Sequence, residues 1–161
     1  MIKYLSKDSI FKILRYPLVW IIVWTAVIYI NSFNSDFLNW DDTFYVTNKY
    51  IQNLNWNNLK LIFSPVNPVE KGNIYHPVFL FSLCLDFYLW QLNPFGFHLS
   101  NFIMFLLNIL FIYIVTMRLF HEKFIASVTA LLFAIHPVNV EAVNWIAART
   151  FLLAGMFSFM S

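Results

Sequence analysis

The sequence predicts an all-α integral membrane protein, a multi-span helical bundle whose first external loop carries interfacial helices. Three observations predict this class. Of the 161 residues, 60% are hydrophobic, 20% are aromatic and only 11% are charged, whereas a soluble domain carries about 25% charged residues. Long uncharged runs recur along the chain, and most acids lie between them. The net charge of +2 gives no sign of a nucleic-acid partner.

The first membrane span is expected over about residues 16–35. Twenty uncharged residues separate Arg15 from Asp36, and at 1.5 Å per residue they reach about 30 Å, the thickness of the hydrocarbon core. Basic residues precede this run, as in a signal peptide, but no small-residue cleavage site follows it. We therefore expect a retained helix, followed by a long polar external loop over 36–97.

Within this loop, residues 78–92 form an apolar run that contains Asp86 and stops at Asn93-Pro94-Phe95-Gly96. The run is short for a span. Ser82, Asp86 and Trp90 are four residues apart and fall on one helical face. The pattern predicts an interfacial helix with a polar stripe.

Three further apolar stretches predict spans over 98–119 and 124–139 and an incomplete span over 149–161, with a short polar HP loop inside residues 136–149. We therefore expect the chain, 1–161, to be the N-terminal part of a longer membrane domain. Asn101 and Asn108 share one face of the second span. They are expected either to be partners of Asp86 or to hold helices together.

Charge placement predicts the orientation in the membrane. Six of the ten basic residues fall on one side of the predicted spans: Lys3, Lys7, Lys12, Arg15, Arg118 and Lys123. Six of the eight acids fall on the other: Asp36, Asp41, Asp42, Glu70, Asp86 and Glu141. We expect a cytoplasmic N-terminus, with the long loop and the HP loop outside.

Two adjacent carboxylates, Asp41 and Asp42, follow the first span by a few residues, beside aromatic side chains. Mutual repulsion and desolvation would raise one pKa toward the range of a general base that activates an alcohol. The alternative is that one of them caps a helix beginning at Thr43. Both can hold, one for each acid.

The HP loop carries His136, Glu141 and Arg149. Glu141 and Arg149 could form a loose ion pair, or Arg149 could meet a lipid phosphate. The acids are hard oxygen ligands that suit Mg²⁺ or Mn²⁺, but no compact spacing requires an ion, so we assign no metal ligand and leave a divalent cation open. His76, which begins the interfacial helix, His136 and Asp86 are further candidate substrate-binding residues.

Taken in order, the motifs WDD, YHP, SLCLDFYLWQLNPFGFHLSN and HPVNVEAVNW with AAR resemble the N-terminal region of the GT-C integral-membrane glycosyltransferases. The nearest branch is the O-mannosyltransferase-like proteins that carry tetratricopeptide repeats. The resemblance implies transfer of a mannose-like sugar from a polyprenyl-phosphate carrier to a Ser or Thr hydroxyl of a protein, in a membrane, here expected to be a bacterial inner membrane.

By this resemblance, Asp41 or Asp42 would be the general base. Glu141 and Arg149 would match the second acidic loop, with Arg149 stabilising the leaving phosphate. The family often has an acid two residues after this arginine, where this chain has Phe151. Three and a half spans also lack most walls of a lipid-carrier cavity, so we expect the chain alone to be inactive.

Two other functions fit the residues. The first is a non-catalytic membrane module or subunit that binds lipid or partner helices. The second is a transporter fragment with Asp86, Asn101 and Asn108 as a site within the membrane. Most acids lie in loops and not within spans, which disfavours the transporter.

Overall fold

The computed structural model describes residues 17–65, 69 and 74–161. Within these ranges the regular elements are all helical, and no strand occurs. Five residues used above for orientation or loop charge, namely Lys3, Lys7, Lys12, Arg15 and Glu70, lie outside the described residues.

The helices follow one another in the order α2 (Pro17–Tyr29), the 3₁₀ turn η1 (Ile30–Asn34), α3 (Asp41–Val46), α4 (Trp56–Ile62), α5 (Pro77–Trp90), α6 (Pro94–Phe120), α7 (Lys123–Ile135), α8 (Val138–Asn144), the 3₁₀ turn η2 (Ile146–Ala148) and α9 (Arg149–Met160).

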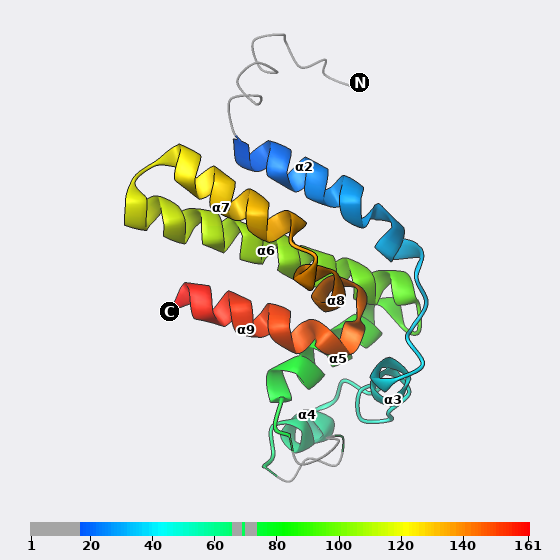
Figure 1. Cartoon of the computed structure of the whole chain (residues 1–161). Helices are drawn as coiled ribbons and strands as arrows, with labels where there is room; N and C mark the ends of the chain where they lie inside the picture. The colour runs from blue at the N-terminus through cyan, green and yellow to red at the C-terminus, as the bar shows by residue number, and fades with distance from the viewer. Residues whose placement is uncertain (1–16, 66–68, 70–73) are drawn as a thin grey trace, which may run out of the picture.

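Helix α6 runs beside α2, α7 and α9 (Figure 1), and it packs most extensively against α7 and α9. By length and apolarity, Pro17–Asn34 and Pro94–Phe120 can each cross a membrane. Helices α7 and α8 can form a third span with a 64° bend between them. The prediction of an all-α membrane fold is confirmed.

Helix α6 begins a turn earlier than the sequence predicted. The Asn93 side chain accepts a hydrogen bond from the amide of Phe95 at 3.2 Å, and Pro94 is the first helical residue. Proline is favourable there because the first amides of a helix have no partner within it. The Pro-Gly segment is therefore the start of α6 and not a loop before it.

The predicted HP loop is also more ordered than expected. His136 has an extended backbone, because the ring of a following proline disfavours helical geometry in the residue before it. This ends α7. Pro137 then precedes a new helix, α8, and η2 follows directly. Most of the predicted loop is thus helical.

Two hydrophobic clusters pack against α6. Tyr29 of α2 packs edge-on against Phe105 of α6, with ring centroids 5.3 Å apart, and the small residues Ala130 and Ala134 bring α7 close to the same region. A second cluster joins Leu80 of α5 to the loop helices and to α9. The second cluster packs α3, α5 and η2 against the N-terminal part of α6.

Candidate functional site

The two adjacent acids open helix α3, after six residues that follow η1. The helix begins at Asp41 and its N-cap is Trp40, which makes no side-chain capping bond. The prediction that one acid caps a helix beginning at Thr43 is therefore wrong. Instead both carboxylates lie in the first turn, where the positive end of the helix dipole favours negative charge.

Asp42 is 0% exposed and connects two distant loops. Its Oδ2 accepts a hydrogen bond from the Leu38 amide at 3.1 Å. Its Oδ1 accepts one from the Ala147 amide of η2 at 2.8 Å, across 105 residues of sequence. Each carboxylate oxygen thus receives a backbone N–H from a different loop.

The electrostatics of Asp42 reflect this position. Burial raises the pKa of Asp42 above its ordinary value, while hydrogen bonds from the amides of Ala147, Leu38 and Ile146 and the nearby His98 lower it. The sequence suggested mutual repulsion with Asp41 together with desolvation, and desolvation is the largest cause here. Asp41 itself is half-buried.

Arg149 is, like Asp42, a completely enclosed charge of the site, at 0% exposure. Its Nη2 pairs with Asp86 Oδ2 at 2.5 Å, and its Nε donates to Asn101 Oδ1 at 2.6 Å. Further bonds run from Nη1 to Ser82 Oγ at 3.2 Å and from Nη2 to the Phe97 carbonyl at 3.1 Å. The guanidinium thereby joins α5, α6 and α9.

Asp86 is held on its other oxygen as well, because Ser100 donates a hydrogen bond to Oδ1 at 2.6 Å. The predicted polar stripe on α5 exists, but Ser82 and Asp86 of this stripe are buried and bond to Arg149. Asn101 reaches Asp86 through Arg149, and Asn108 donates to the Leu152 carbonyl of α9 at 2.9 Å. Both asparagines thus hold helices together.

The ion-pair partner of Arg149 is Asp86 and not Glu141, which is exposed on α8. The position of Arg149 explains why it needs a carboxylate. It is the first residue of α9, where the helix dipole disfavours a cation, and a fully buried charge is costly without a partner.

The two candidate histidines lie apart from the Arg149 cluster. His136 is exposed, and its Nδ1 accepts a hydrogen bond from the Val138 amide at 3.3 Å. His76 precedes α5 and lines a cavity of about 140 Å³ whose other walls include Thr150 and Phe157 of α9. Among the residues that the structure describes, no group of three or more His, Cys, Asp or Glu could hold a metal ion.

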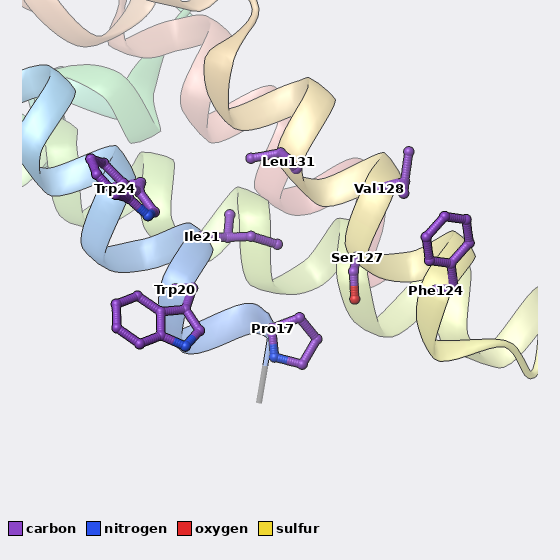
Figure 2. Close-up of a pocket in the computed structure, with 8 residues that line it drawn as sticks. All are labelled: Pro17, Trp20, Ile21, Trp24, Phe124, Ser127, Val128 and Leu131. Carbon is purple, nitrogen blue, oxygen red and sulfur yellow. The ribbon is translucent and has the colours of Figure 1, made fainter. Parts of the chain in front are cut away.

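An apolar groove of about 380 Å³ lies between α2 and α7. Figure 2 shows Trp20 and Trp24 of α2 on one side of it and Phe124 and Val128 of α7 on the other. Pro17, the first residue of α2, also lines it. None of the described residues that line the groove is titratable, and Asp41, Asp42 and Asp86 are not among them.

Sequence reasoning missed two members of the site, Ser100 and Ala147. Ser100 lies one position before Asn101 on α6, and only the packing of α5 against α6 brings it to Asp86. Ala147 contributes its backbone amide, which every non-proline residue possesses. No residue-type signal could therefore have identified it.

Similar proteins give these residues a context. The chain is 41% identical to protein O-mannosyl-transferase TMTC1 of Mus musculus over 50% of the chain and 9% of that protein. It is 32% identical to protein O-mannosyl-transferase TMTC3 of Mus musculus over 58% of the chain and 10% of that protein. A protein O-mannosyl-transferase of Caenorhabditis elegans is 32% identical over 81% of the chain and 20% of its own length.

No family model matches the chain, and no solved structure matches it. The chain spans between about a tenth and a fifth of the length of the curated relatives it matches. The matches nevertheless confirm the resemblance that the motif order predicted. Over the shared region, this membrane protein is a homologue of the protein O-mannosyl-transferases.

Proposed function

We propose that this protein is part of a membrane glycosyltransferase that moves a mannose-like sugar from a polyprenyl-phosphate carrier to a Ser or Thr hydroxyl of a protein. The names of its relatives support a mannosyl transfer to protein. The observation that carries the proposal is the acid pair that opens α3, in which Asp42 is bonded to amides of two loops while Asp41 is left less buried.

In this proposal the two acids have different tasks. A general base must come within hydrogen-bond reach of the hydroxyl whose proton it takes. Asp42 is 0% exposed and already accepts an amide N–H on each oxygen, so it serves as the anchor of α3. Asp41, half-buried and adjacent, is the proton acceptor.

The reaction then follows from the chemistry of the groups. Asp41 takes the proton of the acceptor hydroxyl as its oxygen attacks C1 of the sugar. The bond between C1 and the carrier phosphate breaks, and the phosphate leaves with the electron pair, so the anomeric centre is inverted. Glu141, exposed on α8, is available to contact the protein acceptor, and His76 and His136 are further candidates for substrate contact.

The test is transfer of labelled mannose from polyprenyl-phosphate mannose to a Ser/Thr peptide, in membranes from cells that express the full-length protein. Asp41→Asn should lower the rate by about 10²- to 10⁴-fold, the contribution of a general base. Asp36→Asn, which neutralises an exposed acid of the same loop, is the matched control and should leave the rate unchanged. Equal rates in the wild type and Asp41→Asn would exclude Asp41 as the base.

A second candidate function is a non-catalytic module that binds lipid. It is favoured by Phe151, which occupies the position where the resemblance leads us to expect an acid and is 66% exposed, and by the apolar groove between α2 and α7. Absence of any transfer by wild-type membranes would contradict the transferase and leave this candidate. Retention of a photoreactive lipid in the groove, lost in Ser127→Trp, would then support it.

A further inference from the structure

The buried cluster around Arg149 lies two residues from the amide that holds Asp42. Ala147 donates to Asp42 Oδ1 at 2.8 Å, and Arg149 follows at the start of α9. Between the two stands only Ala148, the last residue of η2, itself 2% exposed. Because only one residue separates Arg149 from Ala147, a displacement of Arg149 would also move the amide that bonds Asp42.

The segment before η2 is fixed to the same helix. The Asn101 Nδ2 lies 3.3 Å from the Val143 carbonyl and 3.4 Å from the Trp145 carbonyl, at the C-terminal end of α8. Such carbonyls have no partner within their own helix. Because Asn101 Oδ1 also accepts from Arg149 Nε at 2.6 Å, one side chain of α6 holds the chain on both sides of η2.

Arg149 has no donor group facing solvent, since the residue is 0% exposed. Four of its hydrogen bonds run to protein acceptors on α5 and α6. A guanidinium bound in this way is well placed to fix the geometry of its neighbours, and it would have to leave Asp86 to reach a donor phosphate.

We propose that the Asp86–Arg149 pair positions the catalytic acids: it holds η2 against α3, so that the Ala147 amide fixes Asp42 and thereby the direction of the adjacent Asp41. This rests on the proposed role of Asp41 as the base. Asp86 and Arg149 are thus positioning residues, acting through Ala147 and Asp42 without touching the substrate.

Asp42 also has charged and titratable neighbours. His98 of α6 and Arg149 of α9 both interact electrostatically with Asp42, and Asp41 precedes it on α3. The hydrogen bond from the Ala147 amide to Asp42 depends directly on the position of η2, because Ala147 belongs to η2. Loss of this bond would weaken the hold of η2 on Oδ1 of Asp42, while Oδ2 still accepts from the Leu38 amide.

Three variants loosen the pair to different degrees. Ser100→Ala removes one hydrogen bond to Asp86 and keeps the ion pair. Arg149→Lys keeps the charge but cannot reproduce the planar fork of donors. Asp86→Asn removes the opposite charge. Arg118→Lys, an exposed arginine near the far end of α6, is the matched control.

Two quantities are measured on the full-length protein in detergent. Hydrogen–deuterium exchange of the peptide that contains Ala147 reports the bond to Asp42, because a hydrogen-bonded buried amide exchanges slowly. Steady-state transfer separates kcat from the KM for the polyprenyl-phosphate donor. We expect both faster exchange and lower kcat in the order Ser100→Ala, Arg149→Lys, Asp86→Asn, with donor KM unchanged and Arg118→Lys like the wild type.

The loss of kcat in Arg149→Lys should be roughly a hundredfold, the size expected when a catalytic group is misplaced by about an ångström. If Asp86→Asn fails to fold, the other two variants still decide. A raised donor KM in Arg149→Lys, with kcat and Ala147 exchange unchanged, would mean that Arg149 contacts the donor and would overturn the proposal.

The exchange measurement does not require catalysis, so the two proposals fail separately. If exchange follows the expected order but Asp41→Asn transfers sugar normally, the assignment of the base is wrong and the structural link stands. If Asp41→Asn is inactive while the three variants leave exchange and kcat unchanged, the positioning role is wrong and the base stands.

Discussion

Asp41 and Asp42 are the same residue type at adjacent positions, yet their surroundings differ. The first is half-buried at the start of α3, and the second is enclosed and bonded to amides of Leu38 and Ala147. Successive residues of a helix point about 100° apart, so one faces the interior and the other the edge of the site. Sequence alone left open which acid anchors and which reacts, because that choice depends on η2, more than a hundred residues later.

Because the pKa of Asp42 is raised in the folded protein, this residue makes the stability of the fold depend on pH. Burial makes the ionised carboxylate less favourable in the folded protein than in the unfolded chain. The contribution of Asp42 to stability is therefore present below the ordinary carboxyl pKa and is lost as pH rises through the raised folded value. The melting temperature of the wild type, minus that of Asp42→Asn, should fall as the pH rises above the ordinary carboxyl pKa of about 4.

Circular dichroism in detergent measures this difference at each pH. The same comparison for Asp36→Asn is the control, because Asp36 is exposed in the same loop. A difference that instead grows with pH would mean that the amide hydrogen bonds to Asp42 outweigh its burial.

At the scale of elements, α9 approaches α6 closely at Gly155. A Cβ built on Gly155 would lie 2.6 Å from Asn108 Oδ1, and Asn108 is held in place by its bonds to the carbonyls of Leu152 and Met104. Gly155→Ala should therefore destabilise the protein by about 1–3 kcal/mol, the usual cost of overpacking. Thermal unfolding in detergent measures it.

Ala154→Val is the matched control for this contact, since it enlarges an exposed position of the same helix. In an Asn108→Ala background the cost of Gly155→Ala should largely disappear, because residues in contact are not additive. An equal cost in both backgrounds would show that the side chain of Asn108 is not the obstacle.

The corner between α5 and α6 contains a strained backbone position. Gln91 has φ 54° and ψ −132°, a region that glycine adopts readily and L-residues with a Cβ do not. We expect Gln91→Gly to stabilise the protein by about 1 kcal/mol through relief of this strain. A lower melting temperature in Gln91→Gly than in the wild type would contradict this.

These elements also show where sequence reasoning succeeds. The first span and the apolar part of α6 were predicted correctly, because the length of an uncharged run can be counted along the sequence. The start of α6 was misjudged because Pro94 and Gly96 suggest a turn, whereas Asn93 caps a helix there. Helix α8 was missed because a seven-residue segment between polar positions has too little periodicity to be recognised.

At the scale of the whole molecule, the functional residues come from segments far apart in the chain. Asp42 lies in the first loop, Asp86 on α5 and Arg149 on α9, yet one network joins them through Ala147 and Asn101. The sequence identified the three charged residues as candidates, but the partners it offered for Arg149 were Glu141 and a lipid phosphate, and not Asp86. Pairing depends on how helices cross in three dimensions, and local spacing does not determine this.

The arrangement of the long helices makes the orientation in the membrane testable. Asp36 follows η1 at the loop end of α6, and Glu122 follows the opposite end of this 27-residue helix, about 40 Å away at 1.5 Å per residue. If α6 spans the bilayer, the two exposed positions lie on opposite sides. The basic residues near Glu122 predict that its side is cytoplasmic.

Single cysteines can distinguish the two sides in a Cys84→Ala background, which removes the one thiol of these 161 residues. In right-side-out vesicles, a membrane-impermeant maleimide should label Asp36→Cys at once and Glu122→Cys only after permeabilisation. Labelling of both before permeabilisation would mean that α6 does not cross the membrane. The reverse order would place the acid pair and Arg149 cluster on the cytoplasmic side, where the proposed external acceptor could not reach them.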